Sequence, residues 1–275
     1  MRPPLQQATI LLTGASAGIG WAMAHELATT ARCLILVARR QERLEALKAE
    51  LLKRNATLQV IVAPCDLTDT DAIDDLLTQL KAQAPQIDIL INNAGFGDIG
   101  AFEFGDWDKL QRMIALNITG LTYLTHRLIK PMRERRSGGI LNVSSGFGLS
   151  FMPGFAVYVG TKHYVTGFTE CLRCEVAGFG VTVSQVCPGP VTTEFEAIAE
   201  NPLEHSVPSF LEISAEHCAR ESLRGFAKGK ALIVPGWRAK FLLWFSRLSP
   251  RPLTRFVLSL GSKTLYKPNL SDSSD

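Results

Sequence analysis

Tyr158 and Lys162 are the two side chains of this sequence whose types and spacing best suit proton transfer. Residues four apart on an α-helix share a face, so the Lys162 ammonium is expected to lie near the Tyr158 phenol. A free tyrosine has a pKa of about 10, and a fixed positive charge beside it favours the phenolate. The pair therefore predicts a phenol of lowered pKa that acts as general acid in a reduction and general base in an oxidation.

A glycine-rich segment near the N-terminus could hold a phosphate group. Gly14, Gly18 and Gly20 follow an apolar run at residues 9–12 and precede a helical pattern at residues 21–29. Glycines permit a tight turn and let a pyrophosphate approach the N-terminus of a helix. A plain strand-to-helix connection can contain the same residues, so the turn needs support from other motifs.

Apolar runs of strand length alternate with helical patterns along the chain. The runs lie at residues 9–12, 33–37, 58–62, 87–91, 140–143, 181–186 and 231–234. Such alternation requires a parallel sheet with right-handed crossovers and helices on both faces. The sequence predicts an α/β protein with a doubly wound, Rossmann-type sheet of seven parallel strands in a single domain, residues 1–236, followed by an extension, residues 237–275.

Other polar motifs stand near the predicted strand ends. Asn92-Asn93-Ala94-Gly95 follows the fourth strand, Ser145 follows the fifth, and Asn117 lies in a long helical segment between them. Together with the glycine-rich turn and the Tyr-x-x-x-Lys pair, these motifs resemble the classical short-chain dehydrogenase/reductase family over residues 9–234. One such motif arises by chance, but all of them in the family's order do not.

The resemblance implies a catalytic set of Asn117, Ser145, Tyr158 and Lys162. Ser145 would orient and polarise the substrate oxygen, and Ser144 fits worse because adjacent residues at a strand end point in opposite directions. Asn117 would support a water-mediated proton relay that ends at Lys162, which would also hold the nicotinamide ribose. An amide that satisfies a kink in its own helix is the alternative for Asn117.

The end of the second predicted strand indicates which dinucleotide would bind. Enzymes that prefer NAD usually carry a carboxylate there, whereas this chain has Ala38-Arg39-Arg40 and no carboxylate before Glu42. An arginine suits a 2′-phosphate, so NADP is the predicted cofactor. A solvated arginine pair that opens the next helix is the alternative. Many relatives that use NADP carry a second basic residue where this chain has Ala17, so the preference would depend on the two arginines.

The resemblance assigns further residues to the cofactor. Asp66 matches a position that bonds the adenine amino group, although it could equally be the N-cap of the following helix. Residues 188–192 match a segment that lies against the nicotinamide, where Val191 and Thr192 would supply backbone and hydroxyl contacts. No metal site is predicted. The predicted cofactor-binding residues are Gly14, Ser16, Gly18, Ile19, Gly20, Arg39, Arg40, Asp66, Asn93, Ala94, Gly95, Tyr158, Lys162, Pro188, Gly189, Val191 and Thr192.

A connection without clean periodicity, residues 193–214, is expected to form the substrate lid. Its apolar side chains, together with others across the cleft, predict an apolar substrate, unless they only bury the connection on the core. These side chains are Phe195, Ile198, Leu203, Phe210 and Leu211 in the connection and Phe147, Phe151 and Met152 across from it.

The C-terminal extension combines aromatic and basic residues. It contains two short amphipathic stretches separated by prolines, and residues 222–271 include no Asp or Glu. The charges make it a poor membrane span, but it could lie on a membrane surface. Packing over the substrate cleft or against another subunit is the favoured alternative.

Composition narrows the class of protein further. A formal net charge of +3 is too small to imply nucleic-acid binding. The six scattered cysteines, including the pair Cys171 and Cys174, are expected to be buried structural thiols, not a disulfide scaffold or a zinc site. The first residues lack an apolar leader segment, so a cytoplasmic location is expected.

These observations predict an NADP-dependent oxidoreductase that transfers a hydride between nicotinamide and a carbonyl or alcohol carbon of an apolar small molecule, with Tyr158 as acid and base. A non-catalytic dinucleotide-binding sensor or scaffold is the alternative from another class, and the complete catalytic set argues against it. Among enzymes, a 3-oxoacyl thioester reductase is the alternative. Members of the family commonly pair through two long helices, here residues 109–135 and 157–178, so a homo-dimer or homo-tetramer is expected.

Overall fold

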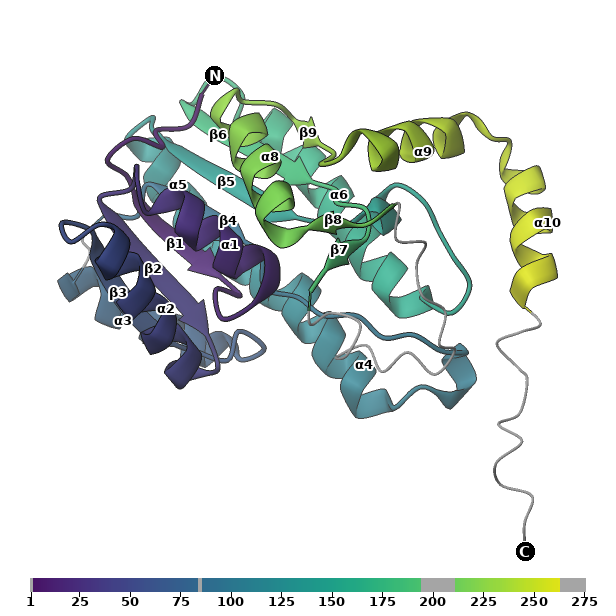
Figure 1. Cartoon of the computed structure of the whole chain (residues 1–275), viewed down its shortest axis with the longest axis horizontal. Helices are drawn as coiled ribbons and strands as arrows, with labels where there is room; N and C mark the ends of the chain where they lie inside the picture. Colours follow the sequence, from purple (N-terminus) through teal and green to yellow (C-terminus); the bar gives the residue numbers. More distant parts are fainter. Residues whose placement is uncertain (1, 84–85, 194–210, 263–275) are drawn as a thin grey trace, which may run out of the picture.

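The apolar runs form one parallel sheet in a computed structural model that describes residues 2–83, 86–193 and 211–262. Across the sheet the strands follow the order β3-β2-β1-β4-β5-β6-β9, and each pairs in parallel with its neighbours (Figure 1). The predicted doubly wound, Rossmann-type architecture is confirmed. Within the described ranges the sheet has seven strands: β1 (Thr9–Thr13), β2 (Cys33–Ala38), β3 (Gln59–Pro64), β4 (Ile89–Asn92), β5 (Gly138–Val143), β6 (Val181–Val186) and β9 (Leu232–Ile233).

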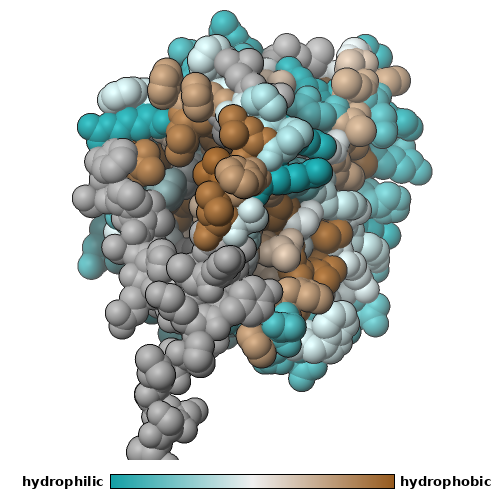
Figure 2. All heavy atoms as spheres, turned by 90° about the vertical axis from the view of Figure 1, so that its right-hand side faces the viewer, coloured by the Kyte–Doolittle hydropathy of each residue, from teal (hydrophilic) through white to brown (hydrophobic). Residues whose placement is uncertain are grey.

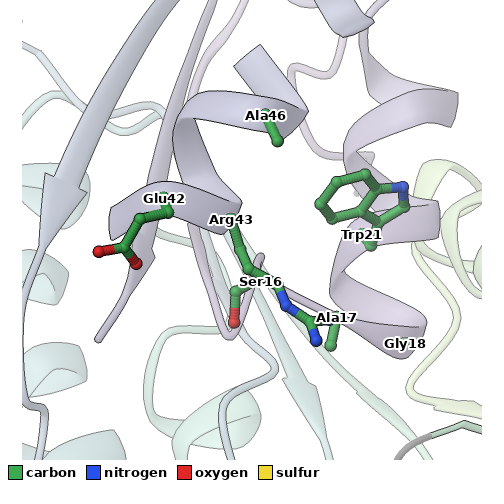
Figure 3. Close-up of a pocket in the computed structure, with 7 residues that line it drawn as sticks. All are labelled: Ser16, Ala17, Gly18, Trp21, Glu42, Arg43 and Ala46. Atoms are coloured by element: carbon green, nitrogen blue, oxygen red, sulfur yellow. The ribbon is translucent and has the colours of Figure 1, made fainter. Parts of the chain in front are cut away.

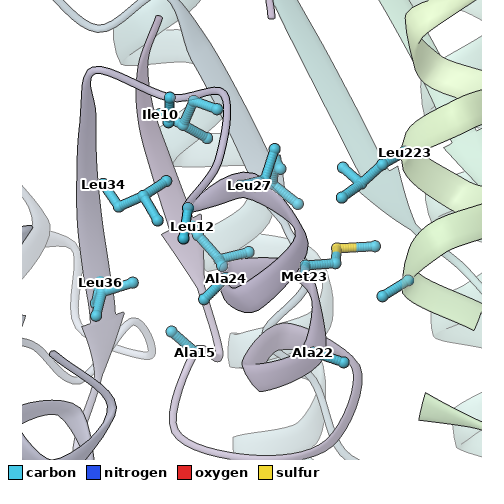
Figure 4. Packing of buried hydrophobic residues seen from close by; sticks show 14 of the residues in the cluster. Ile10, Leu12, Ala15, Ala22, Met23, Ala24, Leu27, Leu34, Leu36 and Leu223 are labelled. Carbon is cyan, nitrogen blue, oxygen red and sulfur yellow. The ribbon is translucent and has the colours of Figure 1, made fainter. Parts of the chain in front are cut away.

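Helices cover both faces of this sheet and enclose two hydrophobic clusters. Successive side chains of a strand point to opposite faces, so Ile10 and Leu12 of β1 belong to one cluster and Leu11 to the other. Figure 4 shows the first cluster, where Leu27 of α1 and Leu223 of α8 lie beside the sheet. The first cluster is bounded by α1 (Gly18–Leu27), α2 (Gln41–Arg54) and α8 (Ala215–Ala227), and the second by α3 (Thr70–Gln83), α5 (Leu121–Glu134) and α6 (Ala156–Glu175).

The long helical segment that contains Asn117 is interrupted by a wider turn. α4 (Trp107–Ile114) continues into a π-helical turn, η2 (Ala115–Gly120), and then into α5. A Cβ at Gly120 would lie 2.1 Å from the carbonyl oxygen of Leu67, so the helix lies directly on the loop after β3. Single π-helical turns of this kind often occur at functional sites, and this one carries Asn117 to the edge of the sheet.

The connection after β6 contains a small parallel sheet that the sequence pattern did not predict. β7 (Val191–Thr192) pairs with β8 (Ile213–Ser214), and Ser214 then caps α8 by accepting a hydrogen bond from the His217 N–H. Most of the expected lid, including Phe195, Ile198, Leu203 and Phe210, lies outside the described residues.

The expectation of buried cysteines is correct for four positions and wrong for two. Cys171 and Cys174 are exposed, because their positions on α6 face away from the sheet. The other four, Cys33, Cys65, Cys187 and Cys218, are buried, and all six are free thiols.

Two helices follow the last strand of the sheet. α9 (Trp237–Leu248) begins beyond β9, and α10 (Arg251–Ser262) lies farthest from the sheet at the right of Figure 1. A Cβ at Gly189 would lie 2.7 Å from the Cβ of Ala239, so α9 packs closely on the loop after β6. Throughout the described ranges, every helix is too short or too polar to cross a bilayer.

Candidate active site

A groove of about 1590 Å³ opens at the carboxyl ends of the strands. Ligands of open α/β sheets bind at this edge, next to the point where the strand order reverses. The reversal here lies between β1 and β4. All of the predicted catalytic and cofactor-binding residues line the groove except Gly20 and Asn117, which lie behind its wall.

Tyr158 is held in the groove by aromatic neighbours. Its ring meets Phe147 edge-on at a centroid distance of 6.3 Å and lies 6.4 Å from Phe155. Only 7% of the residue is exposed, and its phenol group is hydrogen-bonded to Ser145. The phenol therefore has a fixed direction and little contact with water.

The expected lowering of the Tyr158 pKa is wrong for the protein alone. Burial raises the pKa of Tyr158 to about 12, and the hydrogen bond between Tyr158 and Ser145 offsets only part of this effect. The Lys162 Nζ lies 5.7 Å from the centroid of the phenol ring, on the next turn of α6 as predicted. Desolvation outweighs the nearby charge, so the phenol keeps its proton at neutral pH and is suited to donate it.

Lys162 is buried beside the tyrosine. Its ammonium donates a hydrogen bond to the carbonyl oxygen of Val143 at 3.0 Å. Burial lowers the pKa of Lys162 to about 8, because desolvation disfavours the charged form. At neutral pH the side chain is still mostly charged, and the charge is lost as the pH rises through about 8.

Ser144 and Ser145 point in different directions, as predicted. The Ser144 hydroxyl is buried and lies within hydrogen-bonding distance of the Lys162 carbonyl oxygen and of the Thr166 hydroxyl. The Ser145 oxygen lies in the groove, where it accepts a hydrogen bond from the Phe147 N–H at 3.2 Å. The Ser145 oxygen accepts this bond through a lone pair. The hydrogen of the Ser145 hydroxyl therefore remains available for donation to another oxygen atom.

Asn117 fixes the loop after β4 to α6. Its amide donates to the Phe96 carbonyl oxygen at 2.9 Å and to the Thr161 hydroxyl at 3.1 Å, and its oxygen accepts from the Phe96 N–H. A Cβ at Gly95 would lie 2.9 Å from the Asn117 oxygen and 3.5 Å from the Lys162 Nζ. Asn117 thus joins the loop after β4 to the helix that carries Tyr158 and Lys162, and these three hydrogen bonds do not serve a kink in its own helix.

The glycine-rich turn is tied to the Asn-Asn-Ala-Gly motif by short hydrogen bonds. The Thr13 hydroxyl accepts from the N–H groups of Asn93 and Ala94, and the Asn93 amide donates to the carbonyl oxygens of Thr13 and Gly14. Gly14 has a φ of 65°, which L side chains rarely adopt. The turn is therefore held in one shape at the entrance of the groove.

The first turn of α1 has the features of a phosphate site. Ala17 at the N-cap provides no side-chain hydrogen bond, so the first N–H groups of the helix have no cap from that residue. Gly18 has a φ of 55°, and a Cβ there would lie 3.1 Å from the Thr193 side chain. The N–H groups of a helix N-terminus and its positive end, reached through a glycine turn, fit a pyrophosphate.

Gly20 supports this turn from behind, and an alanine there is expected to disrupt it. Its Cβ would lie 2.2 Å from the Gly14 carbonyl oxygen, so the turn must move. We expect Gly20→Ala to weaken NADPH binding at least ~10-fold, measured by nucleotide fluorescence, since the phosphate N–H groups would be displaced. Thr29→Ala, an exposed position just beyond the far end of α1, is the control. Equal NADPH affinity in the two variants would contradict a cofactor site at this turn.

Asp66 lies in the groove and does not cap the following helix. Its carboxylate accepts hydrogen bonds from the N–H and hydroxyl of Thr68, whereas Asp69 accepts from the first N–H groups of α3. Burial would raise the pKa of Asp66, but these hydrogen bonds and the charges of Arg39 and Arg112 hold it below its usual value. The N-cap alternative for Asp66 is wrong, and a charged carboxylate lines the groove.

The two arginines after β2 reach the same end of the groove as the glycine-rich turn. Arg39 and Arg40 line it, and the Arg40 guanidinium donates to the Ser16 hydroxyl at 3.3 Å. The alternative of a purely solvated arginine pair is therefore wrong for Arg40. Both charges lie close to the start of α1.

The segment after β6 differs from expectation at Thr192. The Thr192 hydroxyl donates to the Glu212 carboxylate at 3.2 Å, because β7 and β8 lie side by side. Thr193, which the sequence analysis did not single out, packs against Gly18 and lines the groove. Pro188 accepts a hydrogen bond from the Gly146 N–H at 2.7 Å, which fixes this segment to the loop of Ser145.

Several groove residues carried no signal in the sequence. Phe155 and Phe96 pack around Tyr158, and Arg112 of α4 faces the Asp66 end. Single aromatic or basic residues in loops and helices have no motif, and only the tertiary fold brings them together. In the described part of the chain, no three His, Cys, Asp or Glu side chains gather as a metal site would require.

Comparison with known proteins agrees with this geometry. Residues 8–202 match the family model described as short chain dehydrogenase. The chain is 35% identical over 207 residues to the human "Dehydrogenase/reductase SDR family member 7", covering 74% of this chain and 60% of that protein. It is 36% identical over 178 residues to the "Fatty acyl-CoA reductase" of Acinetobacter baylyi, covering 64% of this chain and 60% of that protein. The chain thus spans about 60% of the length of both relatives.

A solved structure resembles the whole chain. The short-chain dehydrogenase from Sphingobium yanoikuyae in complex with NADPH superposes with a TM-score of 0.75 at 26% identity, covering 98% of this chain and 99% of that one. The superposition covers nearly all of both chains, so the similarity between the two structures extends past the sheet to the C-terminal helices.

Proposed function

This chain belongs to the short-chain dehydrogenase/reductase family, and we propose that within it the protein is an NADP-dependent reductase of apolar carbonyl compounds. One observation carries the proposal: a buried, protonated Tyr158 is hydrogen-bonded to Ser145 in the groove that the glycine-rich turn enters. The Lys162 ammonium on the next turn completes the group.

The proposed reaction divides the work between cofactor and protein. Bound NADPH supplies the hydride that reduces the carbonyl carbon. The Ser145 hydroxyl donates a hydrogen bond to the carbonyl oxygen, and Tyr158 transfers its proton to that oxygen as an alcohol forms. The Lys162 charge stabilises the phenolate that remains, and Asn117 positions the loop beside it. With a pKa of about 12 the phenol is protonated at neutral pH, so Tyr158 is in the form that a general acid for reduction requires.

A second pocket supports the choice of NADP. It has a volume of about 460 Å³ and lies between α1 and α2, lined by Ser16, Ala17, Gly18, Trp21, Glu42, Arg43 and Ala46. In Figure 3 the Arg43 side chain extends toward Ser16 and Ala17, whereas the Glu42 carboxylate points to the other side. Arg43 thus brings a cation to Ala17, where the sequence lacks a basic residue. We propose that Arg39, Arg40 and Arg43 together hold the 2′-phosphate.

Substitution of two of these three arginines gives a direct test of cofactor preference. We expect Arg39→Ala/Arg43→Ala to lower kcat/KM with NADPH about 100-fold and to change kcat/KM with NADH less than about threefold, because only NADPH carries the 2′-phosphate. Arg54→Ala, at the exposed far end of α2, is the control and should change neither value. A protein that uses NADH as well as NADPH, with no effect of the double substitution, would contradict the proposal.

The walls of the groove support an apolar substrate. Phe147, Phe151 and Met152 line it, together with Leu211 at the start of the described range 211–262. The relative from Acinetobacter has the name fatty acyl-CoA reductase, and a fatty acyl group is a long apolar chain. A panel of aldehydes and ketones of graded chain length, with NADPH oxidation followed at 340 nm, tests the proposal directly. We expect activity to rise with chain length, and no oxidation with any compound would refute it.

A substrate carried as a thioester is the second candidate, favoured by the name of the same relative. Addition of a 3-oxoacyl thioester to the panel distinguishes the two. A non-catalytic sensor would need only the cofactor end of the groove, and the assembled Ser145, Tyr158 and Lys162 support an enzyme.

The proposal includes a homo-dimer or homo-tetramer built on α6. The outward side of this helix carries Gly160 and Gly167, where a Cβ would meet nothing within 4 Å, and Tyr164 stacked on Phe168. Glycines on an exposed helix face allow a second helix to approach closely. Light scattering measures the oligomeric state, and a monomer at micromolar concentration would contradict this part of the proposal.

A further inference from the structure

α9 carries an aromatic face that points away from the protein. Trp237, Phe241 and Trp244 follow the spacing i, i+4, i+7 and therefore lie on one side of the helix. Trp237 is 74% exposed and Phe241 is 63% exposed. The opposite side holds Ala239, which is buried against Gly189. The aromatic face is thus presented by a helix that is fixed to the protein on its other side.

α10 repeats this arrangement with aliphatic residues. Leu253, Phe256, Val257 and Leu260 share one side of the helix, and each is more than half exposed. Figure 2 looks onto the side of the molecule that carries α10 and shows apolar residues gathered there beside hydrophilic ones. Soluble monomers seldom expose apolar patches that continue over two helices. We call the exposed sides of α9 and α10 the outer face.

The charged side chains of α9 and α10 are all cationic. Arg238 and Lys240 border the aromatic residues of α9, and the Arg238 guanidinium lies 5.3 Å from the Trp237 ring centroid. Arg251 and Arg255 lie on the side of α10 opposite its apolar residues, and Arg251 lines the groove. The sequence has no Asp or Glu from residue 222 to residue 271. Helices with Trp and Phe on one side and cations beside them are typical of segments that lie in the headgroup region of a membrane.

We propose that the outer face docks the protein on an anionic lipid surface. The aromatic and aliphatic side chains enter the boundary of headgroups and acyl chains, and the cations beside the aromatic residues of α9, Arg238 and Lys240, bind lipid phosphates. Charge complementarity favours lipid over a second copy of this chain, because two outer faces would bring the cations of α9 together, and neither α9 nor α10 carries a carboxylate. The helices lie along the surface, in agreement with the absence of a bilayer-spanning helix among the described residues.

The same helices border the groove on their inner side. Leu242 and Leu243 of α9 and Leu258 of α10 line it, and Val257 lies where the groove meets the outer face. Docking would therefore place the mouth of the groove at the lipid surface. This consequence rests on the proposed function: an apolar carbonyl compound dissolved in the membrane could enter without crossing water.

Co-sedimentation of the full chain with vesicles tests the docking. We expect binding to vesicles of phosphatidylcholine mixed with phosphatidylglycerol at low salt, and little binding to phosphatidylcholine alone or at high salt. Trp237→Ser/Phe241→Ser should weaken binding at least ~10-fold, because two aromatic side chains no longer leave water. Neither residue lines the groove. Trp107→Ser, an exposed tryptophan of α4, is the matched control, and circular dichroism confirms folding.

The outcomes separate lipid from other occupants and from the enzyme proposal. No binding to anionic vesicles, or equal binding of the double variant and the control, overturns the docking. A double variant that turns an oligomer into monomers, without an effect on vesicle binding, assigns the outer face to a second copy. In a parallel assay, the double variant should slow reduction of a long-chain aldehyde dissolved in vesicles but not of a short soluble aldehyde. If neither aldehyde is reduced by any variant, the proposed function fails, while co-sedimentation still decides the docking.

Discussion

Tyr158→Phe is expected to lower kcat/KM for carbonyl reduction about 1000-fold, because the variant keeps the buried ring but has no proton to donate. The ring contacts with Phe147 and Phe155 persist in phenylalanine, so the fold should be unchanged. NADPH affinity should stay within about threefold, since a proton donor contributes mainly to the transition state. Steady-state kinetics and nucleotide fluorescence measure the two effects separately.

A tyrosine on the same helix provides the control for this prediction. Tyr164 lies on the outward side of α6, with its hydroxyl 2.9 Å from that of Thr122. Tyr164→Phe should leave kcat/KM for reduction within about twofold of the original, as expected for a surface residue. If Tyr158→Phe retained activity within tenfold of the original protein, another group would have to supply the proton.

Lys162→Met is expected to abolish most activity and also to stabilise the protein. The loss of the charge beside the phenolate should lower kcat/KM for reduction ~100-fold or more. Burial places the pKa of Lys162 at about 8 in the folded protein, against 10.5 for an ordinary lysine. This difference corresponds to at most about 3 kcal/mol by which the buried charge opposes folding at pH 7. Methionine has no such penalty, so the free energy of unfolding should rise.

The stability that Lys162→Met gains should also depend on pH in a defined direction. Between pH 8 and 10.5 the unfolded chain binds more protons at this lysine than the folded chain, so the original protein becomes more stable as the pH rises. The advantage of Lys162→Met in urea unfolding should be largest below pH 8 and disappear toward pH 10.5. Lys130→Met, on the exposed side of α5, should change stability by less than about 0.5 kcal/mol at either pH. A destabilised methionine variant would contradict the role of burial.

The same lysine sets the pH profile of the original enzyme. For reduction, kcat/KM should be level near pH 7 and fall as the pH rises through about 8, because Lys162 loses its charge while Tyr158 keeps its proton.

The sequence predicted those parts of the protein that depend on local pattern. Buried parallel strands read as continuous apolar runs, so the seven strands of the sheet were recognisable. The glycine turn and the spacing of Tyr158 and Lys162 depend on local backbone geometry, and the structure places both at the same edge of the sheet.

Features that depend on tertiary packing were not predictable. The pKa of Tyr158 is set by burial under Phe147 and Phe155, which lie outside its motif. β7 and β8 have two residues each, too few to show a period. The direction of Arg43 toward Ala17 follows from how α2 lies against α1, and a sequence shows only that a cation is present.

Transfer of an isotopic label tests the central claim most directly. NADPH that carries two deuterium atoms at C4 of the nicotinamide, one on each face, would be incubated with the protein and an aldehyde from the active panel, and the alcohol analysed by mass spectrometry. We expect one deuterium on the carbinol carbon of the product, and none when Tyr158→Phe replaces the original protein at equal time. An alcohol without deuterium, or labelled NADPH that binds and is never consumed, would contradict the account.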